Sequence, residues 1–337
     1  MNTVWQQFLM EQGALTAPQT HYSDAYPGVL LCDLSQFGVL RVSGEDAQTF
    51  LQNMLSNDLS LVGSGCAQLS SLNTPKGRML ASMLIWRDAS GYFLQLPRSL
   101  GEPIRKKLSM YVLRAKVKVA EVSDEIVMLG LSGAIASQLL RSQFGDLPEQ
   151  PYGYTDFGQA GVLKYSDTRF LVIAGTSQAQ LLWRTFSLQA QLQGSANWDW
   201  LNIRAGIPII LPQTQEQFVP QMVNFELLGG VNFKKGCYPG QEIVARMQYL
   251  GKLKRRMYLA HLVGTTLQEA PLPGDELYDT EGLVCGMIAN VAIAPGGGYD
   301  ALVVIQIASR ETQTVRHQSL QGDALQFLEL PYSLTAV

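Results

Sequence analysis

The change of sequence pattern near residue 253 constrains the fold of this chain most strongly. Up to that point, short apolar runs alternate with segments that have the apolar spacing of amphipathic helices. From there to the end, strand-like runs follow one another between clusters of Gly and Pro such as PGGGYD. The first pattern predicts an α+β region with mixed sheets and helices, and the second a small β-barrel or sandwich. The 337 residues exceed one ordinary core, so more than one domain is expected.

The segment 28–59 is the clearest unit of the α+β region. Two short runs rich in Val and Leu predict strands, and Ser43 with Asp46 predicts a capping box at the start of a helix. The apolar residues behind this box recur at helical spacing: Ala47, Phe50, Leu51, Met54 and Leu55. The sequence NTPKGR at 73–78 predicts the turn between two further strands.

The remaining elements are predicted from the same two periodicities. Helices are expected at 101–114, 134–145, 176–194 and 241–250, and strands at 115–122, 125–133, 169–175, 255–263, 274–279, 283–294 and 299–308. The predicted division is an α+β region at 1–250 and a C-terminal β-barrel domain at 251–337.

Positive charge is concentrated in one segment of a mildly acidic chain. The net charge is −3, but residues 234–256 carry seven Lys and Arg against Glu242 alone, which is a local charge of +6. This asymmetry indicates an anionic partner at one place, and a solvated charged face is the alternative. The candidates for phosphate contacts lie in the run KLKRR at 252–256: Lys252, Lys254, Arg255 and Arg256.

Other features exclude several classes of protein. The start, MNTVWQQFLMEQGAL, lacks the basic and apolar regions of a signal peptide, and no stretch approaches the ~20 apolar residues of a membrane span. The three histidines and four cysteines show no ligand spacing, so no metal site is predicted. We expect Cys32, Cys66 and Cys285 to be structural thiols in a reducing cytoplasm.

Cys237 differs from the other cysteines in its sequence context. It follows Lys234 and Lys235 and precedes a Pro-Gly turn and a short helix. A helix N-terminus and two lysines favour a thiolate and are expected to lower its pKa from ~8.5 to between ~3.5 and ~7.5. Gly236 and Gly240 are expected to allow backbone geometry that a Cβ would hinder. A structural turn cysteine is the alternative. The residues expected on the inner face of the helix are Ile243, Val244, Met247 and Leu250.

Several segments together resemble the YgfZ family of folate-binding proteins, which is related to the glycine-cleavage T-protein and to a mitochondrial iron–sulfur assembly factor. They cover nearly the whole chain: GVLLCDLSQFGVLRVSG, DAQTFLQNMLSND, LNIRAGIP, FVPQMVNFELLGGVNFKKGCYPGQEIVAR and LPYSL. The most specific is the cysteine motif K-G-C-[FY]-x-G-Q-E. It is present here as Lys235, Gly236, Cys237, Tyr238, Pro239, Gly240, Gln241 and Glu242, with Arg246 four residues on.

The resemblance implies a T-protein-like fold in which residues 1–250 form two intertwined subdomains, in a ring-like arrangement with the C-terminal barrel around a tetrahydrofolate pocket. It implies cytoplasmic roles in tRNA modification and iron–sulfur protein maintenance, with Cys237 as the functional thiol. The folate-contacting aromatics of the family map to Trp198 and to Phe37, where a well-known member has a tryptophan. Phenylalanine stacks but cannot donate a hydrogen bond. Arg204 stands where relatives often carry glutamate, which puts a carboxylate contact to the pterin in question.

Three functions are compatible with these features. The folate-binding protein above would use the basic run at 252–256 for tRNA, for an iron–sulfur client protein or for the glutamate tail of folate. An aminomethyltransferase-like enzyme is the second, but T-proteins use an aspartate on a strand that here has no Asp or Glu between Lys76 and Arg87. A pure RNA-binding module is the third and would depend on KLKRR alone. Whether a chemical step is catalysed is left open.

Overall fold

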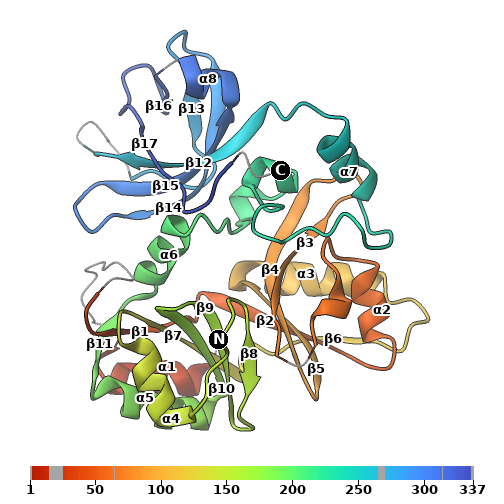
Figure 1. The fold of residues 1–337 in the computed structure, drawn as a ribbon, viewed down its shortest axis with the longest axis vertical. Coiled ribbons are helices and arrows are strands. Elements are labelled where there is room, and N and C mark those ends of the chain that lie inside the picture. Colours follow the sequence, from red (N-terminus) through yellow and green to blue (C-terminus); the bar gives the residue numbers. More distant parts are fainter. Residues whose placement is uncertain (1, 15–25, 64, 265–269, 313, 335–337) are drawn as a thin grey trace. The chain divides into compact units, whose positions relative to one another are not determined.

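The computed structural model describes residues 2–14, 26–63, 65–264, 270–312 and 314–334 (Figure 1). The chain forms two compact units, and each unit gathers segments that are far apart in the sequence. The first unit comprises residues 1–50, 59–68 and 84–198, and the second comprises 51–58, 69–83 and 199–337. These are units of compactness and not of independent folding, so the division at residue 250 stays a prediction.

The first unit contains a six-stranded sheet with the order β11-β1-β7-β10-β9-β8. Its neighbouring strands are antiparallel, except that β1 and β11 are parallel. In chain order the strands are β1 (Val29–Asp33), β7 (Ile126–Ser132), β8 (Tyr154–Asp156), β9 (Ala160–Ser166), β10 (Arg169–Gly175) and β11 (Ala190–Gln193).

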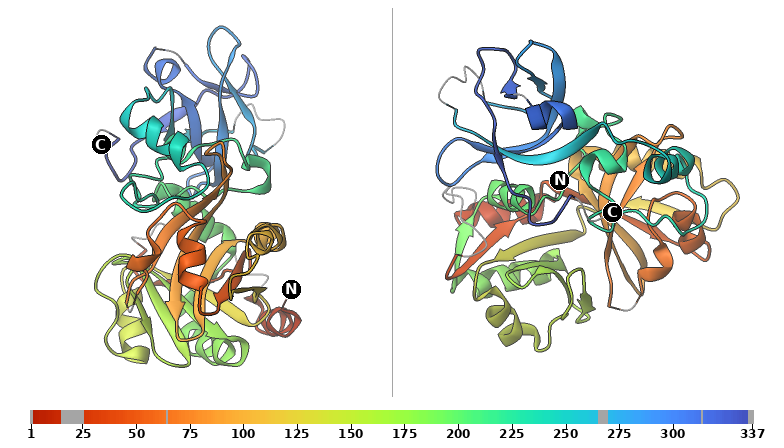
Figure 2. Two further views of the ribbon diagram at one scale, coloured as in Figure 1. Left: turned by 90° about the vertical axis from the view of Figure 1, so that its right-hand side faces the viewer. Right: turned by 45° about the horizontal axis from the view of Figure 1, so that its top comes forward.

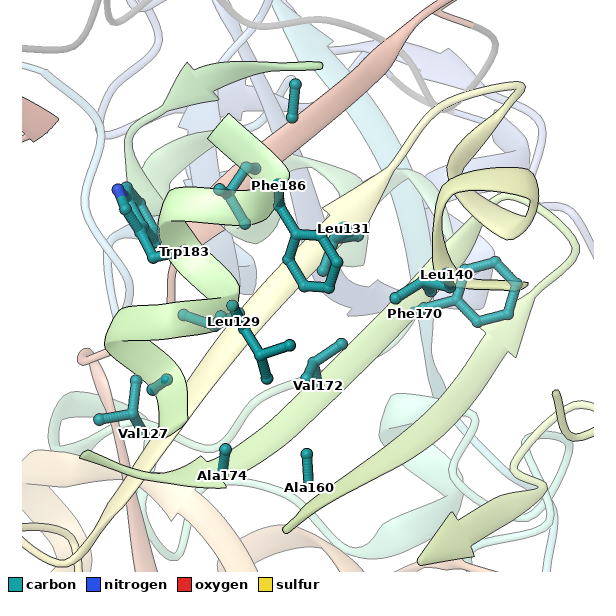
Figure 3. Close-up of a cluster of buried hydrophobic side chains, with 14 of the residues drawn as sticks. Val127, Leu129, Leu131, Leu140, Ala160, Phe170, Val172, Ala174, Trp183 and Phe186 are labelled. Atoms are coloured by element: carbon teal, nitrogen blue, oxygen red, sulfur yellow. The ribbon is translucent and has the colours of Figure 1, made fainter. Parts of the chain in front are cut away.

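Three helices cover one face of this sheet. They are α1 (Thr3–Glu11), α4 (Ala136–Phe144) and α5 (Thr176–Ser187). Leu129 and Leu131 of β7 point to these helices and share a core with Phe186 (Figure 3). Because side chains alternate along a strand, Gly130 lies on the opposite face, where the ring of Trp198 packs against it. This opposite face therefore carries one of the two predicted folate-contacting aromatics.

A five-stranded sheet with the order β3-β4-β5-β2-β6 carries the NTPKGR turn. The turn joins β3 (Gln68–Asn73) to β4 (Met79–Asp88), as predicted. The other elements of this region are β2 (Phe37–Ser43), α2 (Ala47–Gln52), the 3₁₀ helix η2 (Leu59–Leu61), β5 (Gly91–Pro97), α3 (Arg98–Met110) and β6 (Lys118–Glu121). Strand β4 begins in the second unit and ends in the first.

Helix α6 (Ser195–Arg204) begins in the first unit and ends in the second, which continues through a largely irregular segment. This segment contains the 3₁₀ helices η3 (Pro212–Thr214) and η4 (Pro220–Val223), and it ends in α7 (Gln241–Tyr249). Its backbone pairs with the early segments of the same unit: the Met79 amide donates to the Phe218 carbonyl, and the Asn232 amide to the Ser56 carbonyl. The long loop before α7 is thus attached to residues 51–83.

The C-terminal part of the second unit is a curled antiparallel sheet with the order β16-β13-β14-β15-β12-β17 (Figures 1 and 2). Its elements are β12 (Arg255–Leu262), β13 (Glu276–Tyr278), β14 (Val284–Ile293), β15 (Tyr299–Gln306), α8 (Ile307–Thr312), β16 (Arg316–His317) and β17 (Gln326–Leu328). Ala260, Ile288 and Val303 contribute to a core of its own. The sheet is a half-barrel, which confirms the predicted α+β class with a C-terminal β-region.

Three local predictions are wrong. The predicted helix 176–194 ends at Ser187, and residues 190–193 form β11, which pairs with β1. Helix α2 ends at Gln52, although Met54 and Leu55 beyond it are buried as expected. The predicted capping box is absent from α2 because the Asp46 carboxylate instead accepts from the Lys116 amide at 2.7 Å.

Candidate functional site: an anchored cysteine loop

Lys235 fixes the inner side of the cysteine loop, which we define as residues 232–240. Its ammonium group donates to the carbonyls of Gln52 and Leu55 at 2.5 Å and of Asn57 at 3.1 Å. The Gln52 carbonyl lies at the end of α2, and the carbonyls of Leu55 and Asn57 lie in the segment that follows this helix. Lys235 is only 8% exposed, and burial lowers its pKa to about 8. It is therefore a structural anchor, and not part of the exposed positive field that the sequence suggested.

A buried polar network holds the start of the loop. The Ser56 hydroxyl donates to the Gly230 carbonyl at 2.7 Å, and the Asn57 side chain donates to the Gly229 carbonyl at 2.7 Å. The Asn232 carboxamide then accepts from the amides of Lys234 and Lys235 at 2.8 and 3.1 Å. This local turn sends successive side chains in different directions, so Lys234 is exposed while Lys235 is buried.

The end of the loop is fixed where α7 begins. Gly240 has a φ of +82°, and a Cβ there would lie 2.4 Å from the Thr74 carbonyl oxygen and 2.6 Å from the Gly77 Cα. Only glycine fits this position, as expected. The expectation is wrong for Gly236, because a Cβ there would meet nothing within 4 Å. The Gln241 side chain closes the loop by donating to the Lys235 carbonyl at 3.3 Å.

Cys237 lies between these two anchors and is exposed. Its neighbour Tyr238 is buried, and burial raises the pKa of that phenol to about 12. The Lys235 ammonium lies 5.1 Å from the centre of the Tyr238 ring. The motif residues Glu242 and Arg246 are both exposed on α7. The loop thus presents one sulfur to solvent from a backbone that is held on both sides.

The other cysteines fall into two classes. Cys32 and Cys285 are buried, as structural thiols are, and burial raises the pKa of Cys285 to about 11. Cys66 is exposed, so it differs in burial from the other two cysteines that were expected to be structural thiols. Among the described residues, no three His, Cys, Asp or Glu side chains gather in a way that could hold a metal ion.

The basic run is divided by the start of β12. Lys252 and Lys254 are exposed and Arg255 is half-buried, whereas Arg256 is only 8% exposed. Arg256 lies 2.5 Å from the Glu226 carboxylate and donates to the Gln221 carbonyl at 2.9 Å. Burial raises the pKa of Glu226, and Arg256 opposes that rise. The guanidinium of Arg256 is therefore buried and paired within the protein, and the prediction that it contacts an external phosphate is wrong.

Trp198 lies in the first unit in a polar aromatic cluster. The Arg169 guanidinium lies 4.4 Å from the centre of its ring, and Tyr165 meets the ring edge-on at 5.6 Å. The indole is fully buried, and its N–H has no hydrogen-bond acceptor within the described structure. Burial raises the pKa of both Tyr165 and its neighbour Tyr152, the latter to about 12, so both phenols are neutral.

Phe37 and Trp198 both lie next to Leu34. The Phe37 amide donates to the Leu34 carbonyl at 3.0 Å, and the Leu34 side chain lies beside Gly130, beneath the indole of Trp198. Phe37 is 6% exposed, so both rings are buried. These two residues belong to the first unit and Cys237 belongs to the second.

Arg204 belongs to a second polar cluster. It lies 3.6 Å from the buried carboxylate of Asp300, which also accepts from the indole of Trp200 at 2.8 Å and contacts His261 at 2.8 Å. Arg204 thus pairs with an acid of the β-sheet.

Sequence reasoning missed the partners of the predicted site residues. These are Arg169 and Tyr165 around Trp198, and Ser56 and Asn57 beneath the cysteine loop. The signal for the second pair was present, because the buried polar groups lie in the quoted segment LQNMLSND. No local pattern marks Arg169, since it differs from a surface arginine only in what surrounds it.

The comparisons with known proteins first define the class of fold. A family model described as the GCVT N-terminal domain matches residues 6–169. The crystal structure of the glycine cleavage system aminomethyltransferase T from Bartonella henselae is 18% identical to this chain. It has a TM-score of 0.75 and covers 92% of this chain and 88% of its own. The fold is therefore that of a T-protein.

The curated relatives then define the family. Proteins named tRNA-modifying protein YgfZ from Shigella sonnei, Enterobacter sp. and Escherichia coli are each 30% identical to this chain, over 94% of it and 97% of their own length. This chain belongs to the YgfZ family, which confirms the resemblance seen in the sequence.

Proposed function

We propose that this protein binds tetrahydrofolate or another folate and acts in tRNA modification and in the upkeep of iron–sulfur proteins, with Cys237 as its functional thiol. The relatives named as tRNA-modifying and the T-protein fold support the assignment. The observation that carries it is the exposed sulfur of Cys237 on a loop anchored by buried Lys235 and by Gly240. A buried structural cysteine would need neither exposure nor such anchors. The proposed setting is the cytoplasm, where thiols stay reduced.

The residues around Trp198 fit a folate by their hydrogen bonding. The unpaired indole N–H is a donor of the kind that a pterin carbonyl accepts, and Phe37 supplies apolar surface beside Leu34. Trp198 and Phe37 would hold the ring system, and Arg169 would have to move for a ligand to stack on the indole face. A bound tetrahydrofolate would supply a carrier for one-carbon groups.

An aminomethyltransferase-like activity is the second candidate, supported by the T-protein fold. The interior of β4 argues against it, because its first carboxylate is Asp88, the last residue of the strand. Its one hydroxyl, that of Ser82, accepts from the Ile210 amide at 3.0 Å and donates to the Pro208 carbonyl at 3.2 Å. Proton transfer in one-carbon chemistry needs a titratable group within reach, and residues 79–86 of this strand offer none.

Calorimetric titration with tetrahydrofolate tests the folate assignment. Trp198→Phe keeps an aromatic ring but removes the N–H donor, so binding should weaken by about 5- to 10-fold if that donor pairs with the ligand. Trp183→Phe is the matched control, because Trp183 is also buried with an unpaired indole N–H but lies on the helix-covered face. The control should bind like the wild type. No heat of binding with the wild type would remove folate from the proposal.

The role of the thiol is tested in cells that lack the chromosomal gene. Cys237→Ser changes one exposed atom and should leave thermal stability unchanged while modified nucleosides in tRNA, measured by mass spectrometry, fall to the level of the deletion. Cys66→Ser is the control, because Cys66 is equally free of disulfides and exposed. Alkylation at neutral pH should favour Cys237 over Cys66 if the loop promotes its thiolate. Full complementation by Cys237→Ser would reduce the motif to a structural turn.

A further inference from the structure

Two aromatic side chains form an exposed pair beside the cysteine loop. Phe233 and Tyr249 lie with ring centres 6.0 Å apart and planes at 70°, an edge-to-face contact. Tyr249 is 68% exposed, and Phe233 is half-buried. An edge-to-face contact covers at most one face of each ring, so the largely exposed Tyr249 can offer a ring face to solvent, with Phe233 beside it.

Positive side chains flank this ring pair. Lys234 follows Phe233 directly, Arg246 precedes Tyr249 by one helical turn, and Lys252 and Lys254 follow α7; all four are exposed. No carboxylate within the described residues lies within 4.0 Å of any of the four. Their charge is therefore available to an external partner, in contrast to that of Lys235 and Arg256.

The ring pair and the thiol belong to one short stretch of backbone. Phe233 contacts Tyr249 at the C-terminal end of α7, while the Lys235 carbonyl accepts from Gln241 at its N-terminal end. The loop therefore runs along α7. Cys237 follows Phe233 by four residues, so their Cα atoms are at most about 14 Å apart.

We propose that Phe233 and Tyr249 form a stacking platform for an unpaired nucleotide of RNA, with Lys234, Arg246, Lys252 and Lys254 binding the adjacent phosphates. Exposed aromatics interleaved with unpaired cations are the features by which proteins bind single-stranded nucleic acid, because every base has a π-face and every linkage a charge. An acidic protein segment would use the cations and leave the rings without a role. This inference deepens the proposed function, because it identifies the part of a tRNA substrate presented to Cys237: an unpaired loop and not a duplex stem.

Fluorescence anisotropy with a labelled oligouridylate of about 12 nucleotides tests the platform. Tyr249→Ala should weaken binding by roughly 5- to 150-fold, the usual effect of removing one base-stacking ring, whereas Tyr249→Phe should bind like the wild type. Leu250→Ala is the matched control: Leu250 has no π-face and is 85% exposed on the same turn, so the expectation that it lies on the inner face of the helix is wrong. Reversing Lys252 and Lys254 together should flatten the log–log salt slope by about 1.4.

Several outcomes would overturn this inference. The first is that Tyr249→Ala binds the oligouridylate as tightly as the wild type does. The second is that the wild type binds an RNA duplex of the same length as tightly as it binds the oligouridylate. The third is that a polyglutamate peptide displaces the labelled RNA as well as unlabelled oligouridylate does. No RNA binding at all would also overturn it. The proposed function would fail differently, by loss of folate binding or by full activity of Cys237→Ser in cells, so the two failures can be told apart.

Discussion

At the scale of single residues, two adjacent lysines have opposite roles. Lys234 faces solvent, whereas Lys235 points inward and pairs with three carbonyls of residues 52–57. In the sequence KKGC the two lysines have the same local composition, and their positions relative to α7 differ by one residue. Their difference comes from residues that are about 180 positions earlier in the chain, and no pattern within the motif encodes it.

Removal of the Lys235 side chain is expected to destabilise the protein. Lys235→Ala removes the ammonium group that donates to the carbonyls of Gln52, Leu55 and Asn57, so the free energy of unfolding should fall by about 2–4 kcal/mol, measured by urea denaturation. Lys234→Ala should change it by less than about 0.5 kcal/mol. Equal effects of the two substitutions would contradict the anchoring role.

The pH dependence of this effect has a definite sign. The folded pKa of Lys235, about 8, lies below its ordinary value of 10.5. Between these values the unfolded state binds more protons, so stability rises with pH through Lys235. The stability of the wild type relative to Lys235→Ala should therefore increase from pH 8 to pH 10. A constant difference over that range would mean that this lysine does not titrate there.

At the scale of elements, periodicity predicted most helices and strands but not where they end. The run after Ser187 is rich in Gln, Ala and Leu, which favour helix, yet its pairing with β1 makes residues 190–193 a strand. Helix α2 ends at Gln52, and the carbonyl of that residue accepts a hydrogen bond from Lys235, which lies 183 residues further along the chain. The cysteine motif was predictable because Gly240 and Cys237 lie close together in one short segment of the sequence. The ring pair was not, because Phe233 and Tyr249 meet only when the loop folds along α7.

The start of α7 offers a matched pair of glycine substitutions. Gly240→Ala forces a Cβ into the Thr74 carbonyl at positive φ and should lower stability by about 1–3 kcal/mol, together with the helical content near α7. Gly236→Ala meets open space and should be nearly neutral. Thermal unfolding followed by circular dichroism measures both. A neutral Gly240→Ala would show that the turn rearranges without cost.

At the scale of the whole molecule, the C-terminal sheet has its own core but is also hydrogen-bonded to the preceding segment, residues 206–224. Asn224 donates to the Met257 carbonyl at 3.0 Å, Asn290 to the Ile209 carbonyl at 2.8 Å, and Tyr332 to the Gly206 carbonyl at 2.8 Å. The proposed domain 251–337 therefore contains a complete sheet, and it is hydrogen-bonded to the preceding segment at Met257, Asn290 and Tyr332. Among the helices of the described residues, none combines the length and the apolar character of a membrane span.

Expression of residues 251–337 alone tests the proposed division. The fragment retains all six strands and the core around Ile288, so it should give a β-type spectrum and unfold cooperatively. Its melting temperature should lie below that of the full chain, because Asn290 and Tyr332 lose their partners. A random-coil spectrum would show that the segment 199–250 is an obligate part of the same domain.

The second unit is built from segments that are far apart in the sequence, and this also sets the order in which the nascent chain can fold. Ser56 and its partner Gly230 are separated by 174 residues. At synthesis rates of about 5–20 residues per second, roughly 9–35 s pass between their appearance from the ribosome. By the end of this interval the residues of the first unit have all been translated, while the early segments of the second still lack Lys235 and its loop. The cysteine loop can reach its anchored state only late in translation, so a chain truncated before residue 235 would carry a first unit without a held thiol.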